Sequence, residues 1–127
     1  MQVFDAKSGW GSKVNFVDEH NVLVGYDLSQ SCCETADWFI SEKVESDYEF
    51  GSDLNQPRES LGAYVFDAAF HKQFPAPGLD EGEMAVFKLV CDGKPDMFLH
   101  LFNCHNGYYG HGFEQIVGGI VVRYGDL

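Results

Sequence analysis

The dipeptide Asn106-Gly107 narrows the choice of fold more than any other pair of residues in the chain. A type I′ turn needs positive φ at both central positions, and asparagine and glycine adopt that conformation at the lowest cost. We therefore predict a hairpin in which residues 97–105 pair with residues 108–114. Both faces of this hairpin are substantially apolar, so we expect it to be central in a sheet and covered on both sides.

The predicted register places His100 opposite Phe113 and gives Cys104 and His111 a common face. Their diagonal separation would be about 7–8 Å, within reach of two converging side chains. Zinc takes three or four protein ligands, so the others would have to come from Cys32, Cys33, Glu34 or His71. The sequence thus offers a transition-metal site at Cys104, His111, Cys32 and Glu34 as one hypothesis. Packing of these side chains in an aromatic-rich core is the alternative, with no cofactor bound.

A thiol enzyme is a second chemical hypothesis for the same stretch. A nucleophilic cysteine needs a histidine within hydrogen-bond reach and a third group to orient that histidine. Cys33 and Cys104 are the candidate nucleophiles, His111 or His105 the candidate base, and Asn103 or Glu34 the orienting group. The chain contains no GxSxG, phosphate loop, dinucleotide fingerprint or HExxH, so no other catalytic class is indicated.

Charge and length limit the function further. The 127 residues predict one domain, residues 1–127, and the formal net charge of −12 opposes direct binding to nucleic acid or to an anionic membrane. A DNA-mimicking inhibitor would need these acids gathered on one face. No basic leader followed by an apolar run and no stretch of eighteen apolar residues occurs, so we expect no membrane insertion. Four cysteines in such a chain suggest free thiols in the cytoplasm.

Strand-forming segments recur along the chain between turn signals. Residues 13–17 and 21–28 predict a hairpin, 83–91 alternates strictly, and 2–4, 61–70 and 116–124 are further strand candidates. Residues 31–44 carry a capping-box pattern and helical spacing, although Trp38-Phe39-Ile40 favours a strand. We predict a mainly β protein, alternatively α+β: an antiparallel sandwich or partly closed barrel of about seven strands with at most one or two short helices.

The segments Ser31-Cys-Cys-Glu34 and Asn103-Cys-His-Asn-Gly-Tyr-Tyr-Gly-His-Gly-Phe113 resemble a loose group of small bacterial and phage-borne proteins. Those proteins carry a Cys-Cys-Glu near the middle and an Asn-Gly-Tyr-Tyr segment near the end, where serine often stands in place of Gly110. The resemblance implies a small β-rich domain without assigned activity. It also implies that Cys32, Cys33, Glu34 and residues 106–109 belong to one spatial feature.

The leading functional prediction is a non-enzymatic, acidic domain that binds another protein or assembles with itself. Its motivation is the lack of a catalytic signature together with aromatic residues of the kind that anchor interfaces. The candidate anchors are Trp10, Trp38, Tyr108 and Tyr109.

Overall fold

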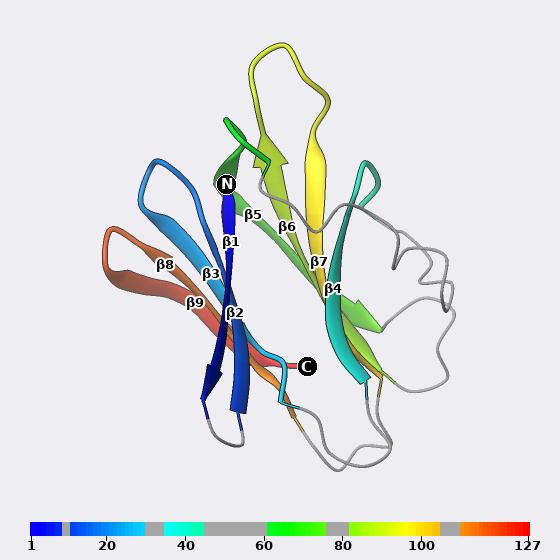
Figure 1. Cartoon of the computed structure of the whole chain (residues 1–127). Coiled ribbons are helices and arrows are strands. Elements are labelled where there is room, and N and C mark those ends of the chain that lie inside the picture. Colours follow the sequence, from blue (N-terminus) through cyan, green and yellow to red (C-terminus); the bar gives the residue numbers. More distant parts are fainter. Residues whose placement is uncertain (9–10, 30–34, 45–60, 76–81, 105–109) are drawn as a thin grey trace.

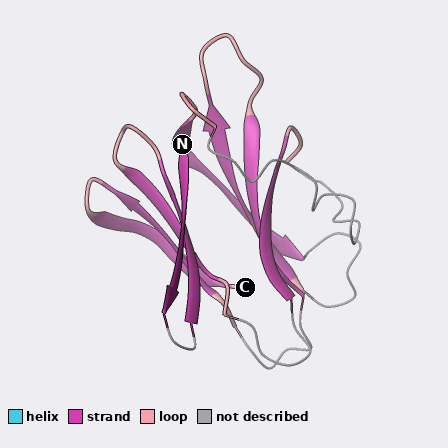
Figure 2. Ribbon diagram, in the orientation of Figure 1, coloured by secondary structure: helices cyan, strands magenta, loops and turns pink. Residues whose placement is uncertain are grey.

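The computed structural model describes residues 1–8, 11–29, 35–44, 61–75, 82–104 and 110–127, and these form nine strands and no helix (Figures 1 and 2). The strands are β1 (Gln2–Ser8), β2 (Gly11–Val17), β3 (Val22–Asp27), β4 (Thr35–Ser41), β5 (Val65–Pro75), β6 (Glu83–Val90), β7 (Met97–Cys104), β8 (Gly112–Val117) and β9 (Ile120–Asp126).

Two antiparallel sheets face each other. The first has the order β1-β2-β3-β8-β9 and the second the order β4-β7-β6-β5. The predicted mainly β, antiparallel sandwich is therefore confirmed, with nine strands where about seven were expected. The surplus arises because residues 2–8 form a full strand and because residues 35–41, expected within a helix, form strand β4.

The core lies between the two sheets and is built from both. Val14, Phe16, Val24 and Tyr26 project from the first sheet, and Leu99 is among the side chains that meet them from the second. The Tyr26 hydroxyl donates a hydrogen bond of 2.9 Å to the carbonyl of Phe102, which satisfies the one polar atom of a fully buried ring. Apolar burial on both inner faces supplies most of the stabilisation.

The outer face of the second sheet is also covered by apolar side chains. Phe39, Met84, Val86, Phe98 and Phe102 form a separate buried cluster there. Strand β7 is thus buried on both faces, as expected from its two apolar faces.

The predicted hairpin of residues 97–105 with 108–114 is wrong. Strand β7 lies between β4 and β6, whereas β8 lies between β3 and β9 in the other sheet. His100 is paired with Phe39 and Val86, and Phe113 with Tyr26 and Gly125, so His100 and Phe113 are not opposite each other. Each strand is hydrogen-bonded to two neighbours within its own sheet, and the chain crosses from one sheet to the other between β7 and β8. The Asn106-Gly107 turn itself lies outside the described residues.

A tight two-residue turn, Gly118-Gly119, joins β8 to β9. Their φ values are 57° and 84°, the positive values that a type I′ turn requires. The predicted hairpin of residues 13–17 and 21–28 is confirmed by β2 and β3, with Asn21 at φ 64°. The helix predicted within residues 31–44 is wrong over Thr35–Ser41, which is strand β4.

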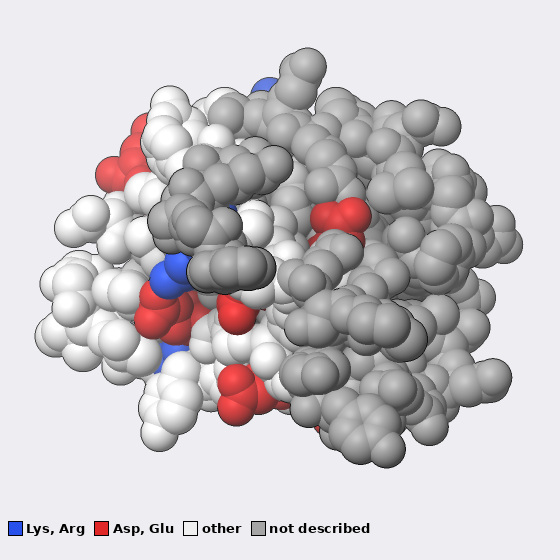
Figure 3. Space-filling model, turned by 60° about the horizontal axis from the view of Figure 1, so that its bottom comes forward, with Lys and Arg blue, Asp and Glu red and all other residues white. Residues whose placement is uncertain are grey.

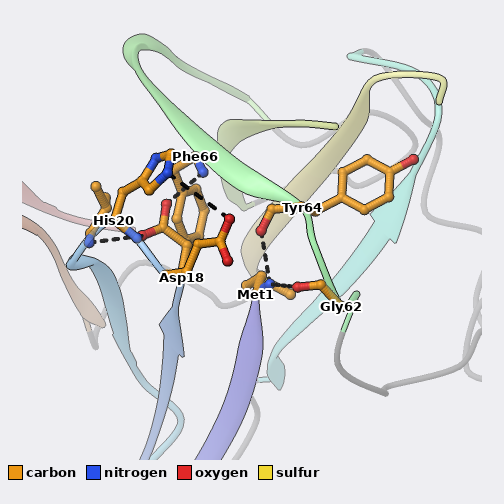
Figure 4. A network of polar contacts seen from close by, with 8 residues as sticks. Met1, Asp18, His20, Gly62, Tyr64 and Phe66 are labelled. Carbon is orange, nitrogen blue, oxygen red and sulfur yellow. Dashed lines mark hydrogen bonds and ion pairs between the residues drawn. The ribbon is translucent and has the colours of Figure 1, made fainter. Parts of the chain in front are cut away.

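A buried carboxylate joins the two sheets at one end of the sandwich (Figure 4). Asp18 follows β2, and its Oδ1 accepts hydrogen bonds from the amides of His20 and Val22, both at 2.9 Å. Its Oδ2 accepts a hydrogen bond of 2.8 Å from the amide of Phe66, in β5 of the other sheet. Asp18 therefore fixes the β2–β3 turn and holds that turn against β5.

The amino group of Met1 makes a second tie beside Asp18. It donates to the carbonyls of Gly62 and Tyr64 at 2.7 and 2.8 Å (Figure 4). Burial lowers the pKa of this amino group below its ordinary value of 8.0, and the negative charge of Asp18 acts in the opposite direction. The first strand is thereby anchored to the segment that precedes β5.

Candidate functional site

The residues proposed from sequence as a metal or thiol site do not share the face of one hairpin. Cys104 ends β7, and His111 directly precedes β8 in the opposite sheet. The residues on either side of 105–109 nevertheless lie close together. The side-chain amide of Asn103 and the backbone of His111 both form hydrogen bonds with Leu127. The side chain of Cys104 is outside the part of the chain that the structure describes.

His111 has a structural partner. It is buried, and its Nδ1 donates a hydrogen bond of 2.8 Å to the carbonyl of Asp27. The amides and carbonyls of His111 and Leu127 are also paired with each other, at 2.9 and 3.0 Å. His111 therefore links Leu127, through its backbone, to the end of β3, through its imidazole.

Most of the other predicted site residues lie outside the described residues. They are Trp10, Cys32, Cys33, Glu34, Tyr108 and Tyr109. Trp38 is described and is 3% exposed, in the core between the sheets, so its ring cannot be an interface anchor. Within the described part of the chain, no three histidine, cysteine or acidic side chains form a group that could hold a metal ion. Cys91 is a free, partly buried thiol.

Among the described residues, His100 is a fully buried titratable side chain with two close acceptors. Its Nδ1 and Nε2 each lie 3.0 Å from a backbone carbonyl, those of Phe98 and Val44, and its ring stacks on Phe39 at 4.3 Å between centroids. A neutral imidazole has one N–H and can donate to only one of these carbonyls. Burial lowers the pKa of His100 below its ordinary 6.5, against the opposite effect of the bonds to Val44 and Phe98.

Acid is therefore expected to destabilise the fold through His100. The unfolded chain takes up this proton near pH 6.5, whereas the folded chain takes it up only at lower pH. The free energy of unfolding should be unaffected above pH 6.5 and fall below it, by at most about 2 kcal/mol at about pH 5. Urea denaturation across this range, compared between wild type and His100→Phe, measures the effect. The variant should lose part of the pH slope, and His20→Gln, at an exposed turn, should keep it; equal slopes in all three would contradict the assignment.

A polar cluster ties β5 to the β8–β9 pair inside the sandwich. Arg123 donates through Nη1 to Gln115 Oε1 and, at 3.4 Å, to the carbonyl of Ala68. Among the described residues, the buried Nε2 atoms of Gln115 and His71 have no hydrogen-bond partner. Burial lowers the pKa of His71, and the charge of Arg123 adds to that effect. The neutral form of His71 is thus the one that suits this interior position.

A hollow of about 720 Å³ crosses the outer face of the first sheet. Strand register aligns the outward residues of four strands into two rows. In one row Gly25 is opposite Glu114, which is opposite Tyr124; in the other Lys13 is opposite Asp27, and Gly112 is opposite Asp126. We call this hollow, lined by those residues with Ser12, Ser29, Phe113, Val121 and Gly125, the outer groove.

Glycines form the floor of the outer groove. A Cβ atom on Gly25 would lie 2.9 Å from Lys13 Cε, so the lysine chain crosses the sheet directly over that glycine. A Cβ atom on Gly112 would lie 3.5 Å from Asp126 Oδ1, an ordinary contact distance, so a side chain fits there. The absence of a side chain at Gly112 is what leaves this end of the groove open.

The charges in the outer groove are predominantly negative. Lys13 Nζ is 2.6 Å from Glu114 Oε1, which leaves Asp27 and Asp126 as two further carboxylates. Asp27 accepts a hydrogen bond of 2.8 Å from the amide of Ser29, and no described residue pairs with the Asp126 carboxylate. Figure 3 shows acidic side chains beside fewer basic ones on the described part of the end of the molecule that it turns forward. The groove thus presents an electronegative, partly apolar surface.

Strand β9 borders the outer groove and is an edge of its sheet. Within the described residues it pairs with β8 alone. Its side chains Ile120, Val121, Val122 and Tyr124 are 69%, 50%, 51% and 82% exposed. A β-branched, apolar edge strand presents unpaired backbone groups to any extended chain that reaches it. At its far end, the Asp126 carbonyl accepts a bond from Gln73, so the open part is Ile120–Tyr124.

Sequence reasoning missed both the outer groove and the exposed edge. The predicted strand of residues 116–124 is divided by the Gly118-Gly119 turn, and the edge position of Ile120–Tyr124 depends on which strand pairs with β8. The available signal was Gly118-Gly119, because a two-glycine turn identifies the strand before it as one partner of the strand that follows.

No family model, no curated protein and no solved structure matches this chain. Among the described residues, no helix is long and apolar enough to cross a membrane.

Proposed function

We propose that this protein binds an extended segment of another polypeptide, which adds to the first sheet along β9. The observation that carries the proposal is the edge strand itself, with four exposed apolar or aromatic side chains next to the open backbone of Ile120–Tyr124. In strand addition, main-chain hydrogen bonds supply affinity and the alternating side chains supply specificity. The role is that of a non-enzymatic interaction domain, which we place in the cytoplasm.

A second copy of the chain is the obvious competing occupant of the same edge. Pairing β9 with β9 would bring together two molecules that each carry a formal net charge of −12. Such like-charge association is opposed, most strongly at low salt. We therefore favour a different polypeptide as partner over self-assembly. The metal, thiol and DNA-mimic alternatives have no comparable observation in their favour.

The proposal is tested with peptides selected from a displayed random library. Peptides enriched on the wild-type protein should bind it with micromolar dissociation constants. The double variant Ile120→Lys, Val122→Lys places two charges on the edge, where lysine blocks strand pairing, and should weaken binding at least tenfold. Both positions are exposed, so the fold is expected to persist.

Phe4→Lys is the matched control, because Phe4 is 50% exposed on β1, the other edge of the same sheet. This variant should bind within about twofold of wild type. Failure to enrich any peptide, or equal binding by the β9 variant, would refute the proposal. Sedimentation velocity adds a third test, since a dimer that the β9 double variant abolishes would show self-pairing instead.

A further inference from the structure

We propose that the outer groove is the specificity pocket of this interaction, and that it takes an arginine or lysine side chain of the added segment. The inference rests on the proposed strand addition at β9 and names the chemistry of the partner. It follows from the position of the groove, its shape and its charge, each of which derives from described residues.

The position is set by the register of the sheet. Tyr124 and Asp126 of β9 project onto the outer face, and they are opposite Glu114 and Gly112 of β8. A segment paired with the open side of β9 would have every second side chain on this same face. A long side chain from such a position can cross β9 into the hollow above Gly112, whereas a short one cannot reach it.

The negative charge of the groove favours a positively charged side chain. Lys13 and Glu114 neutralise each other at 2.6 Å, so Asp27 and Asp126 give the pocket a surplus of two negative charges. A guanidinium group can bond to a carboxylate with two parallel N–H donors. An acidic side chain would meet like charges at the same place and be rejected.

The aromatic ring at the entrance favours arginine over lysine. Tyr124 is 82% exposed and lies between the open edge of β9 and the groove. Guanidinium groups stack on tyrosine faces, and the attraction at exposed positions is modest. The partner is therefore an extended polypeptide segment with alternating apolar residues and at least one arginine whose side chain faces the groove.

The experiment uses the full chain and short extended peptides derived from those selected above. In each peptide one position facing the groove is varied among arginine, lysine, glutamine and glutamate, and binding is followed by fluorescence anisotropy. Arginine should bind about tenfold more tightly than glutamine at low salt, with lysine between them and glutamate weakest. The preference should shrink to about twofold at about 0.5 M salt, because the charges are exposed.

Two variants locate the preference within the protein. Asp27→Asn with Asp126→Asn should reduce the arginine-to-glutamine ratio to about one, and Asp92→Asn, at an exposed turn between β6 and β7, should leave the ratio unchanged. Gly112→Val fills the floor at an ordinary contact distance and should abolish the preference while the backbone contacts with the peptide persist. Circular dichroism and urea denaturation check that each variant is folded.

The outcomes separate this inference from the function on which it rests. If peptides bind along β9 without a preference for a basic side chain, the specificity pocket is refuted and strand addition stands. If the preference exists but survives Asp27→Asn with Asp126→Asn, the pocket is elsewhere and the inference is again refuted. If no peptide binds, both proposals fail together.

Discussion

Replacement of Asp18 by alanine is expected to lower the free energy of unfolding by about 3–5 kcal/mol, a large part of the stability of a domain this size. Three backbone N–H groups, of His20, Val22 and Phe66, would lose their acceptor. The bonds from Val22 and Phe66 are buried, so water cannot replace the carboxylate without opening the contact between the sheets. Charged acceptors make these bonds stronger than those between neutral groups.

Urea denaturation followed by tryptophan fluorescence measures this loss. Asp18→Asn keeps one acceptor oxygen but turns an amide N–H₂ towards a backbone donor, so we expect an intermediate loss. Glu19→Ala is the control, because the neighbouring Glu19 side chain is 70% exposed and should contribute less than about 0.5 kcal/mol. Hydrogen exchange at the Phe66 amide should accelerate in Asp18→Ala. A loss below about 1 kcal/mol would show that Asp18 does not hold the two sheets together.

Local sequence patterns predicted where the strands lie better than they predicted which strands pair with each other. The alternation in residues 83–90 and the turn at 18–21 are short-range features. The strand predicted from the first, β6, and the hairpin predicted from the second, β2–β3, are both present. Asn106-Gly107 was also a short-range feature, but it carried no information about which sheet each flanking strand would join. Strand β7 found its neighbours, β4 and β6, in one sheet, whereas β8 pairs with β3 and β9 in the other.

Two local signals compete in residues 31–44. Ser31 and Glu34 match a capping box, whereas Trp38, Phe39 and Ile40 favour a strand. In the structure all three of those side chains are buried, with Trp38 and Ile40 packed towards the core and Phe39 packed on the outer cluster. Burial on both faces is available to a strand and not to a short helix at an edge, so the tertiary context determined the outcome.

The candidate site could not have been derived from local sequence. The outer groove combines Lys13, Gly25, Gly112 and Asp126 from four strands, and their alignment exists only through the register of three strand pairs. No spacing in the sequence encodes that register. The exposed aromatic residue that matters at this site is Tyr124, which composition alone cannot distinguish from the buried Tyr26.

Truncation of Trp38 to alanine is the second large effect we expect, with a loss of about 3–5 kcal/mol in the free energy of unfolding. The indole packs edge to face on Phe16 at 4.9 Å between centroids, so it joins β4 of one sheet to β2 of the other. The vacated space would be enclosed by both sheets, which cannot collapse onto it without losing their own contacts. Trp38→Phe should keep part of the contact and cost about half as much.

Tyr124→Ala is the matched control for this aromatic truncation, since Tyr124 is 82% exposed. It should change stability by less than about 0.5 kcal/mol and weaken binding of arginine-containing peptides, whereas Trp38→Ala should show the opposite pattern in any fraction that remains folded. Thermal or urea unfolding, together with peptide anisotropy on both variants, separates a core residue from a binding residue. A stability loss below about 1.5 kcal/mol for Trp38→Ala would contradict its place as a bridge between the sheets, because truncation of a buried ring of this size leaves a cavity between them.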